Sequence, residues 1–421
     1  TIGHRTNTTG GISDADVTIR SRSFDRVTGD SGSGLFAVDT SLGSMLVANM
    51  AGGHLSLVGM GSAGIEMDSR MVWDTAFDVN LLSYSNIFVV DDLINRGSGD
   101  INIFAGWNPA IAPLFSGATS PFRGNWIRDV NADTDLFGVT SSYGKDGGSI
   151  WVGAKADFSA ADRSVVVGSR LGQTNVAGYD VRVWGAAFTG GIEIGHQRYS
   201  QIGYTRVDGG SAVTDPVTGR IRVGAVQDVE VAANHYEVGV IGYGGWGTGT
   251  NNSGNASYAQ IGHGGERTSV RDQTLNGEII VEAGGDVDLK GGITFNNHAT
   301  IGHGAYDNPD DDDDNNLAVL GGKITVAAGG DVNLTAGLGY YAQAQIGHGG
   351  ASHYLADFIK SDISVTAGGD VSLLGGGGSV ATAANQSSAQ IGHGGYNGDF
   401  IENSDPGVPN SVIPVSAGSG R

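Results

Sequence analysis

Four histidines of this 421-residue chain share one repeated setting, and histidine suits both proton transfer and metal binding near neutral pH. The setting is Ile-Gly-His-Gly, with steps of 40, 45 and 45 residues between copies. The isoleucines are Ile261, Ile301, Ile346 and Ile391, and the histidines are His263, His303, His348 and His393. Because a catalytic imidazole is needed once rather than four times, the regular spacing favours a structural role in a repeating fold.

A shared metal ion is the second chemistry that repeated histidines suggest. Another motif alternates with the first, so we expect consecutive histidines to lie two coils apart, about 9–10 Å by strand spacing. Two imidazoles that share a zinc ion need their nitrogens within about 3.5 Å, because each Zn–N bond is near 2.1 Å. The sequence therefore predicts no metal and no cofactor at these histidines. We expect each ring to form a hydrogen bond with a turn carbonyl.

Polysaccharide hydrolysis is the enzymatic alternative. Pectin-degrading glycoside hydrolases are also β-helices with a Gly-His-Gly element, and glycoside hydrolysis needs acidic residues as acid and base. The pair Asp91-Asp92 lies far in sequence from every Gly-His-Gly copy. These hydrolases also carry a basic pair after their Gly-His-Gly, whereas the nearest match here, Arg220-Ile221-Arg222, precedes every copy. The sequence therefore predicts a protein that is not an enzyme. A glycoside hydrolase or lyase acting on a polysaccharide is the alternative.

Aspartates recur in the alternating motif, Ala-Gly-Gly-Asp, as Asp286, Asp331 and Asp370. Aspartate side chains often accept hydrogen bonds from backbone amides in turns, and we expect that role here.

The run Asp310–Asp314, with Asp307 nearby, is the densest charge of the chain. Calcium binds oxygen atoms of this kind. Side chains of contiguous residues diverge, which favours a solvated loop, with calcium binding as the alternative.

The composition excludes several classes of function. The chain has 23 basic and 44 acidic residues, a net charge of −21 at pH 7, whereas a nucleic-acid binder needs a positive face. The same sign argues against insertion in, or binding to, an anionic membrane. Disulfides, Fe–S clusters and thiolate zinc sites are excluded because the chain has no cysteine. A cysteine-free chain fits export into an oxidising space, where stray thiols would mispair.

Short runs of alternating apolar residues predict β-strands along the chain, and 73 glycines supply turns between them. Two motif types alternate, and one pair takes about 45 residues. We therefore predict an all-β fold, a right-handed parallel β-helix (β-solenoid) with coils of about 20–23 residues and excursion loops. About 19 such coils would form a rod of roughly 90 Å. A β-propeller, with blades of about 40–45 residues, is the rival fold.

Regularity divides the chain into three parts. Residues 1–133 are predicted to form irregular coils with an excursion loop near 107–133, residues 134–250 continue the solenoid, and residues 251–421 carry the regular repeats.

The four motif isoleucines should stack in one buried column, with Gln260, Gln345 and Gln390 outside. Thr1-Ile2-Gly3-His4 repeats the sequence of residues 300–303. We therefore expect both ends to be cut within the repeat and to meet further chain or another copy.

The repeated unit resembles the secreted β-helical exoproteins of the filamentous-haemagglutinin type. The segment 324–337, Ile-Thr-Val-Ala-Ala-Gly-Gly-Asp-Val-Asn-Leu-Thr-Ala-Gly, carries this resemblance, and its pattern recurs from about residue 85 onward. The resemblance implies export across a Gram-negative outer membrane and display at the cell surface. We therefore expect an extracellular, structural and adhesive shaft of a bacterial surface fibre. Expected partners are further copies or segments of the chain, glycans or surface receptors.

Overall fold

The computed structural model describes about half of the chain. The described residues are 17–21, 36–39, 43–44, 46–47, 53–59, 64–83, 85–106, 148–154, 164–185, 199–205, 216–233, 258–264, 274–292, 297–304, 318–337, 342–349, 354–376, 387–394, 399–400 and 415–417. The expected loop near 107–133, the Asp310–Asp314 run and the segment Thr1–His4 lie outside them.

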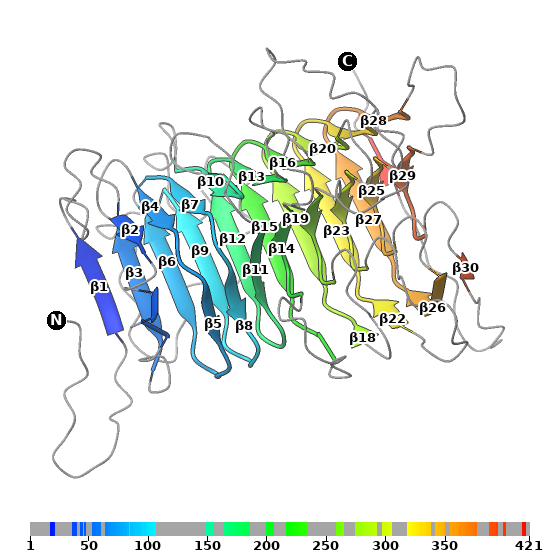
Figure 1. The fold of residues 1–421 in the computed structure, drawn as a ribbon. Helices are drawn as coiled ribbons and strands as arrows, with labels where there is room; N and C mark the ends of the chain where they lie inside the picture. The colour runs from blue at the N-terminus through cyan, green and yellow to red at the C-terminus, as the bar shows by residue number, and fades with distance from the viewer. Residues whose placement is uncertain are drawn as a thin grey trace, which may run out of the picture.

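Parallel strands form three long sheets that run the length of the described chain (Figure 1). In each sheet, neighbours come from successive coils, which is the topology of a parallel β-helix. Sheet A contains β1 (Val17–Ser21), β3 (Leu55–Gly59), β6 (Val79–Ser83), β9 (Ile101–Ala105), β12 (Thr174–Gly178), β15 (Ile221–Ala225), β19 (Ile279–Ala283), β23 (Ile324–Ala328), β27 (Ile363–Ala367) and β31 (Val415–Ser416).

Sheets B and C are the other two long faces, and a short sheet D follows sheet C in the later coils. Sheet B contains β2 (Phe36–Val38), β4 (Ile65–Met67), β7 (Ile87–Val89), β10 (Ile150–Val152), β13 (Val181–Trp184), β16 (Val229–Ala232), β20 (Val287–Lys290), β24 (Val332–Thr335) and β28 (Val371–Leu374). Sheet C contains β5 (Met71–Trp73), β8 (Leu93–Asn95), β11 (Val165–Ser169), β14 (Ser200–Ile202), β17 (Ala259–Ile261), β21 (Ala299–Ile301), β25 (Ala344–Ile346) and β29 (Ala389–Ile391). Sheet D contains β18 (Thr274–Leu275), β22 (Ala318–Gly321), β26 (Tyr354–Lys360) and β30 (Asp399–Phe400).

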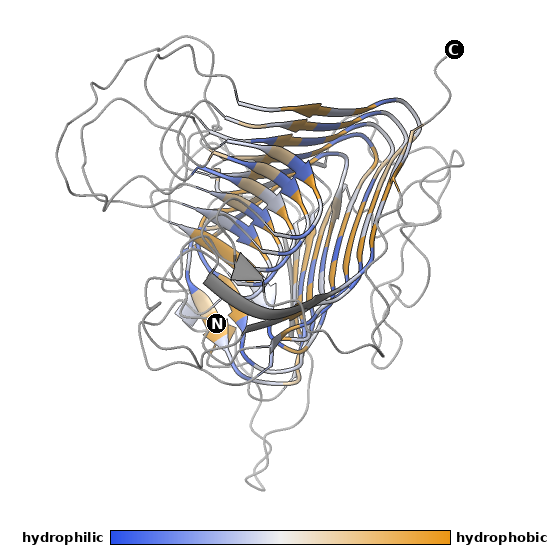
Figure 2. Ribbon diagram, turned by 90° about the vertical axis from the view of Figure 1, so that its right-hand side faces the viewer, coloured by the Kyte–Doolittle hydropathy of each residue, from blue (hydrophilic) through white to orange (hydrophobic). Residues whose placement is uncertain are grey.

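The core is a set of apolar columns along the solenoid axis. Strand β23, for example, alternates buried and partly exposed residues, so Ile324 and Val326 point inward. Their partners in the adjacent coil are Ile279 and Val281, and all four are fully buried. Figure 2 shows the same alternation, with hydrophobic positions superposed from coil to coil. In-register stacking buries identical residue types without a globular core, which confirms the predicted β-helix and excludes the propeller.

The coil length changes along the chain, and this corrects one expectation. Leu55 pairs with Val79, and Val79 pairs with Ile101, so these coils take 24 and 22 residues. In contrast, Ile279 pairs with Ile324, so this coil takes 45 residues. The two alternating motifs therefore belong to one long coil and lie on different sheets. Sheet A has ten strands, so the described stack is about 43 Å long at about 4.8 Å per step, rather than roughly 90 Å.

Candidate functional site

The four motif histidines form a single stack at the ends of β17, β21, β25 and β29. Their rings lie face to face, with centroids 4.8 Å apart for the first two pairs and 5.1 Å for His348 and His393. The preceding isoleucines pair directly in the same order, which confirms their predicted column, although Ile391 is only partly buried. The expected separation of 9–10 Å was wrong, because each 40–45-residue step is one coil and not two.

Hydrogen bonds use both nitrogens of each histidine ring. The backbone N–H of His263 donates to Nδ1 of His303 at 2.9 Å, and that of His303 donates to Nδ1 of His348 at 3.0 Å. Since Nδ1 is the acceptor, Nε2 carries the proton and donates to a carbonyl oxygen. For His263 and His303 these acceptors are Gly219 and Gly277, each at 2.6 Å. The ring therefore bonds a turn carbonyl, as predicted, and also joins two coils.

Burial keeps these imidazoles neutral. His263, His303 and His348 are fully buried. Desolvation lowers the pKa of His263 to about 4. The same cause, with the neighbouring rings adding to it, lowers the pKa of His348 to about 3 and that of His303 well below its usual value. An imidazole with a depressed pKa and both nitrogens bonded is unsuited to proton transfer near neutral pH.

The motif glutamines are part of the same joint between coils, which corrects the expectation that they lie outside, in solvent. Gln260 and Gln345 are each about 1% exposed. The Gln260 side-chain amide donates to the Gly302 carbonyl at 2.8 Å, one coil further along. The side chain thus satisfies carbonyl groups of the Gly-His-Gly turn, which the ladders of sheet C leave unpaired.

The motif glycines allow the turns to stack this closely. A Cβ atom at Gly302 would overlap the carbonyl oxygen of Gly347, and one at Gly347 would overlap that of Gly392. Gly347 also has a φ of 155°, which residues with a Cβ atom rarely adopt. Close approach of backbone to backbone is the requirement that Gly302 and Gly347 share, and the positive φ adds to it at Gly347.

The Ala-Gly-Gly-Asp aspartates form a ladder of their own between sheets A and B. The Asp331 backbone N–H donates to Oδ1 of Asp286 at 2.7 Å, and the Asp370 N–H donates to Oδ1 of Asp331 at 2.7 Å. The ladder extends upstream, because the Asp286 N–H donates to Oδ1 of Asp228 at 2.8 Å. This confirms that the motif aspartates accept hydrogen bonds from turn amides.

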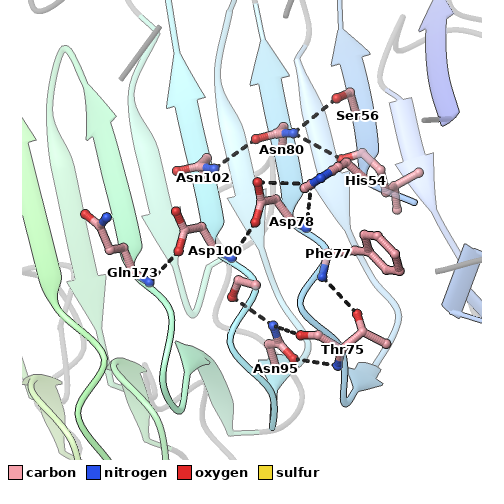
Figure 3. Close-up of polar contacts among 12 residues, drawn as sticks. His54, Ser56, Thr75, Phe77, Asp78, Asn80, Asn95, Asp100, Asn102 and Gln173 are labelled. Carbon is pink, nitrogen blue, oxygen red and sulfur yellow. Dashed lines mark hydrogen bonds and ion pairs between the residues drawn. The ribbon is translucent and has the colours of Figure 1, made fainter. Parts of the chain in front are cut away.

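A second polar cluster, which the sequence analysis missed, lies in the short coils (Figure 3). The Asp100 backbone N–H donates to Oδ1 of Asp78 at 2.7 Å, and the Gln173 N–H donates to Oδ1 of Asp100 at 2.7 Å. Beside it, Asn102 donates to Asn80 at 2.9 Å. The signal was present in sequence, since these residues recur at the 22–24-residue step of the coils, but no repeated motif surrounds them.

The surface end of this cluster carries the group best placed for acid–base chemistry. His54 Nδ1 lies 3.0 Å from both the backbone nitrogen and Oδ2 of Asp78. The side chains of His54 and Asp78 are 40% and 29% exposed, and the imidazole packs edge-on against Phe77. Burial and the charge of Asp78 raise the pKa of Asp100. An imidazole and two carboxylates are thus adjacent, although each carboxylate already accepts a backbone hydrogen bond.

The pair Asp91-Asp92 forms a buried corner between β7 and β8. Asp92 Oδ1 accepts a hydrogen bond from the Val166 backbone at 3.0 Å, and Oδ2 lies 3.2 Å from Nε of Arg70. Burial is the main cause that raises the pKa of Asp92 to about 6. These bonds hold adjacent coils together. None of the four motif histidines is among the partners of Asp92.

Metal chemistry finds no support in the described part of the chain. Within it, no group of three or more His, Asp or Glu side chains is arranged to hold an ion. The stacked rings bond backbone groups through both nitrogens, so they offer no lone pair to a metal. The Asp310–Asp314 run lies outside the described residues.

Among the helices described, none is long and apolar enough to span a membrane.

Comparison with known proteins identifies no relative. No family model matches the chain, and no curated protein or solved structure matches it significantly. The function must therefore be argued from the fold and from the contacts described above.

Proposed function

We propose that this chain is a non-catalytic, extracellular shaft segment of a bacterial surface fibre, with a structural and adhesive role. The observation that carries this proposal is the continuity of the side-chain ladders. Histidine, glutamine and aspartate side chains bond from coil to coil, in addition to the backbone ladders of three sheets. Such an arrangement stiffens a rod along its axis.

Stiffness and adhesion follow from different parts of the coil. The inward Ile, Val and Leu columns resist bending because each coil is in van der Waals contact with the next. Many outward positions of sheets A and B are polar in the regular repeats, for example Thr325, Asn333 and Thr335 on β23 and β24, although Ala327 on β23 also faces outward. Weak contacts from repeated polar faces add through multivalency, which suits attachment to glycans or surface receptors.

Labelling of intact cells tests this proposal. Antibodies against the purified chain should label the outside of source cells and, by electron microscopy, follow fibres that extend from the surface. External protease should remove the label without lysing the cells. Label that appears only after permeabilisation, or that never extends beyond the cell envelope, would overturn the fibre role.

A polysaccharide hydrolase or lyase is the second candidate, and the His54 cluster is the observation that favours it. His54, Asp78 and Asp100 bring an imidazole and two carboxylates together at a partly exposed position. The purified chain should release no reducing sugar or unsaturated product from acidic and neutral polysaccharides. If it does, and Asp78→Asn abolishes the activity while His303→Gln does not, the enzymatic function replaces the shaft.

A further inference from the structure

The outward face of sheet B carries a column of large side chains in the middle of the solenoid. Phe88 of β7 and Trp151 of β10 are neighbours in the register, and their rings stack with centroids 5.0 Å apart. Arg182 of β13 pairs next with Trp151, and its guanidinium carbon lies 5.3 Å from the centre of the indole ring. Figure 1 shows β10, β13, β16 and β20 side by side in successive coils. The column therefore runs along the solenoid axis.

Further along the axis, the same face continues as a chain of polar contacts. Glu230 of β16 accepts a hydrogen bond from the indole Nε1 of Trp184 at 3.1 Å and lies 2.8 Å from Nζ of Lys290. Lys290 Nζ also lies 3.1 Å from Oδ2 of Asp288. Asn333 donates its side-chain amide to Oδ1 of Asp288 at 3.0 Å. We call these five residues the sheet-B strip: Trp184, Glu230, Asp288, Lys290 and Asn333.

The side chains of the sheet-B strip are in contact with solvent. Those of Asp288 and Lys290 are 25% and 47% exposed, and that of Glu230 is 15% exposed. Trp184 and Asn333 are also partly exposed. Ion pairs that are open to solvent contribute little to stability, and a partly exposed indole forgoes part of the gain from burial. Packing of the coils alone therefore does not account for this combination of side chains.

The indole of Trp184 is held in place at its polar edge. Its Nε1–H donates to Glu230 in the next coil, where the register partner of Trp184 is the small, buried Ala232. The ring therefore extends over β16 rather than away from the sheet. A ring fixed in this way offers an apolar surface beside carboxylate, ammonium and amide groups. Sugars match such a surface, because the face of a pyranose ring presents C–H groups and its rim presents hydroxyl groups.

The charges of the sheet-B strip favour a neutral glycan over an acidic one. Lys290 faces two carboxylates, and the Arg182 guanidinium lies 3.0 Å from Oδ2 of Asp180, so these cations are already matched. The chain has a net charge of −21, which repels polyanions. The carboxylates and the amide of the strip suit uncharged hydroxyl groups, which both donate and accept hydrogen bonds.

We propose that the sheet-B strip binds a neutral polysaccharide whose chain runs along the solenoid axis. One sugar unit stacks on Trp184, and its neighbours form hydrogen bonds with Glu230, Asp288 and Asn333. Successive coils are about 4.8 Å apart, close to the length of one extended pyranose unit, so neighbouring sugars meet neighbouring coils. This gives the adhesive contact of the fibre a location and rests on the fibre role for its biological meaning. A sheet face encloses little of its ligand, so each strip binds weakly and many copies along a fibre add through multivalency.

Affinity electrophoresis with soluble polysaccharides tests this binding. The purified chain migrates through native gels that contain hydroxyethyl cellulose, xylan or galactomannan, with polygalacturonate as the acidic comparison. At least one neutral polysaccharide should retard the wild-type chain, with no loss on added salt, whereas polygalacturonate should not retard it. Trp184→Ala should weaken the binding at least tenfold, and Trp184→Phe should keep most of it. Thr325→Ala, at an outward position of sheet A, is the matched control and should bind as the wild type does.

Retardation by none of the neutral polysaccharides, or by polygalacturonate alone, would overturn the proposal, and so would equal affinity of Trp184→Ala and the wild type. Circular dichroism identifies a misfolded Trp184→Ala. In that case Asn333→Ala, which alters a partly exposed amide, takes its place and should bind at least threefold more weakly; an unchanged affinity refutes the strip. Glycan binding without surface label on cells would keep the strip and reject the fibre role, whereas surface label without glycan binding would do the reverse.

Discussion

Acid should destabilise the regular coils through the stacked histidines. Folding lowers the pKa of His263 to about 4 and that of His348 to about 3, from an ordinary value near 6.5. Above pH 6.5 the ring is neutral in both states, and its contribution is fully present. As the pH falls from 6.5 towards the folded-state pKa, only the unfolded chain takes up a proton, so stability is lost. Below the folded-state pKa no further loss occurs.

The expected loss is large because several rings act together. pH 5 lies about 1.5 units below the ordinary histidine pKa, and each unit removes about 1.36 kcal/mol of unfolding free energy. Each fully buried ring therefore lowers the stability by roughly 2 kcal/mol at pH 5. His263 and His348 together give about 4 kcal/mol, and His303, whose pKa is also lowered by burial, acts in the same direction. Asp92 has the opposite sign, because burial raises its pKa to about 6 and the folded state takes up the proton first. Asp92 offsets about 1 kcal/mol of the loss at pH 5, and Asp100 acts in the same direction.

Urea unfolding followed by circular dichroism, at pH 7 and pH 5, measures this loss. The side chain in His303→Gln keeps a donor and an acceptor but cannot be protonated. This variant should therefore lose less unfolding free energy than the wild type between pH 7 and pH 5. Leu171→Gln, at an exposed position, is the control and should show the wild-type loss. Hydrogen exchange should place the weakened amides in the coils of the histidine stack. Equal losses for wild type and His303→Gln would refute the reasoning.

Three further outcomes are expected from the packing of the coils. Gly302→Ala should lower the free energy of unfolding by about 3 kcal/mol, because its Cβ would overlap a carbonyl. Gly375→Ala is the control: no described atom lies within 4 Å of the added Cβ, so the free energy of unfolding should change by less than about 1 kcal/mol in the same urea assay. Ile301→Ala leaves a cavity in a fully buried column and should cost about 2–5 kcal/mol by thermal melting; a smaller cost would mean the column is loosely packed. Asp331→Ala should cost about 0.5–1.5 kcal/mol, since the exposed Asp370 N–H exchanges its carboxylate acceptor for water. Asp331→Asn keeps an acceptor oxygen and should lose less unfolding free energy; equal losses for the two variants would contradict the ladder.

The fold could be predicted because its information is local and repeated. Alternating runs such as Ile324-Thr325-Val326 identify strands, and the recurring motifs align them in parallel register. Coil length could not be obtained in the same way, because a motif pair of 45 residues fits either one long coil or two short ones. The register of sheet C decides for one coil, and so shortens the distance between the histidines.

The polar positions were harder to predict than the apolar ones. Alternation placed Gln260 outside, on the assumption that a polar side chain next to a buried isoleucine faces solvent. The turn that follows β21, one coil further along, instead directs its carbonyl groups at that side chain, and burial of the amide is favourable because it pairs them. The Asn80–Asn102 contact was missed for a related reason: only the register shows that these two residues are neighbours.

The side-chain ladders also make each finished coil a template for its neighbour during folding. Each coil offers an N–H at its histidine and a carboxylate at its aspartate, and the next coil in sequence supplies the imidazole and the amide that pair with them. A chain that folds from its N-terminal side therefore always has, at the growing tip, a template for the coil that emerges next. The same hydrogen bonds that join finished coils would then make propagation sequential, so that a defect such as a bulky residue in one Gly-His-Gly turn stops the coils beyond it and spares those before it.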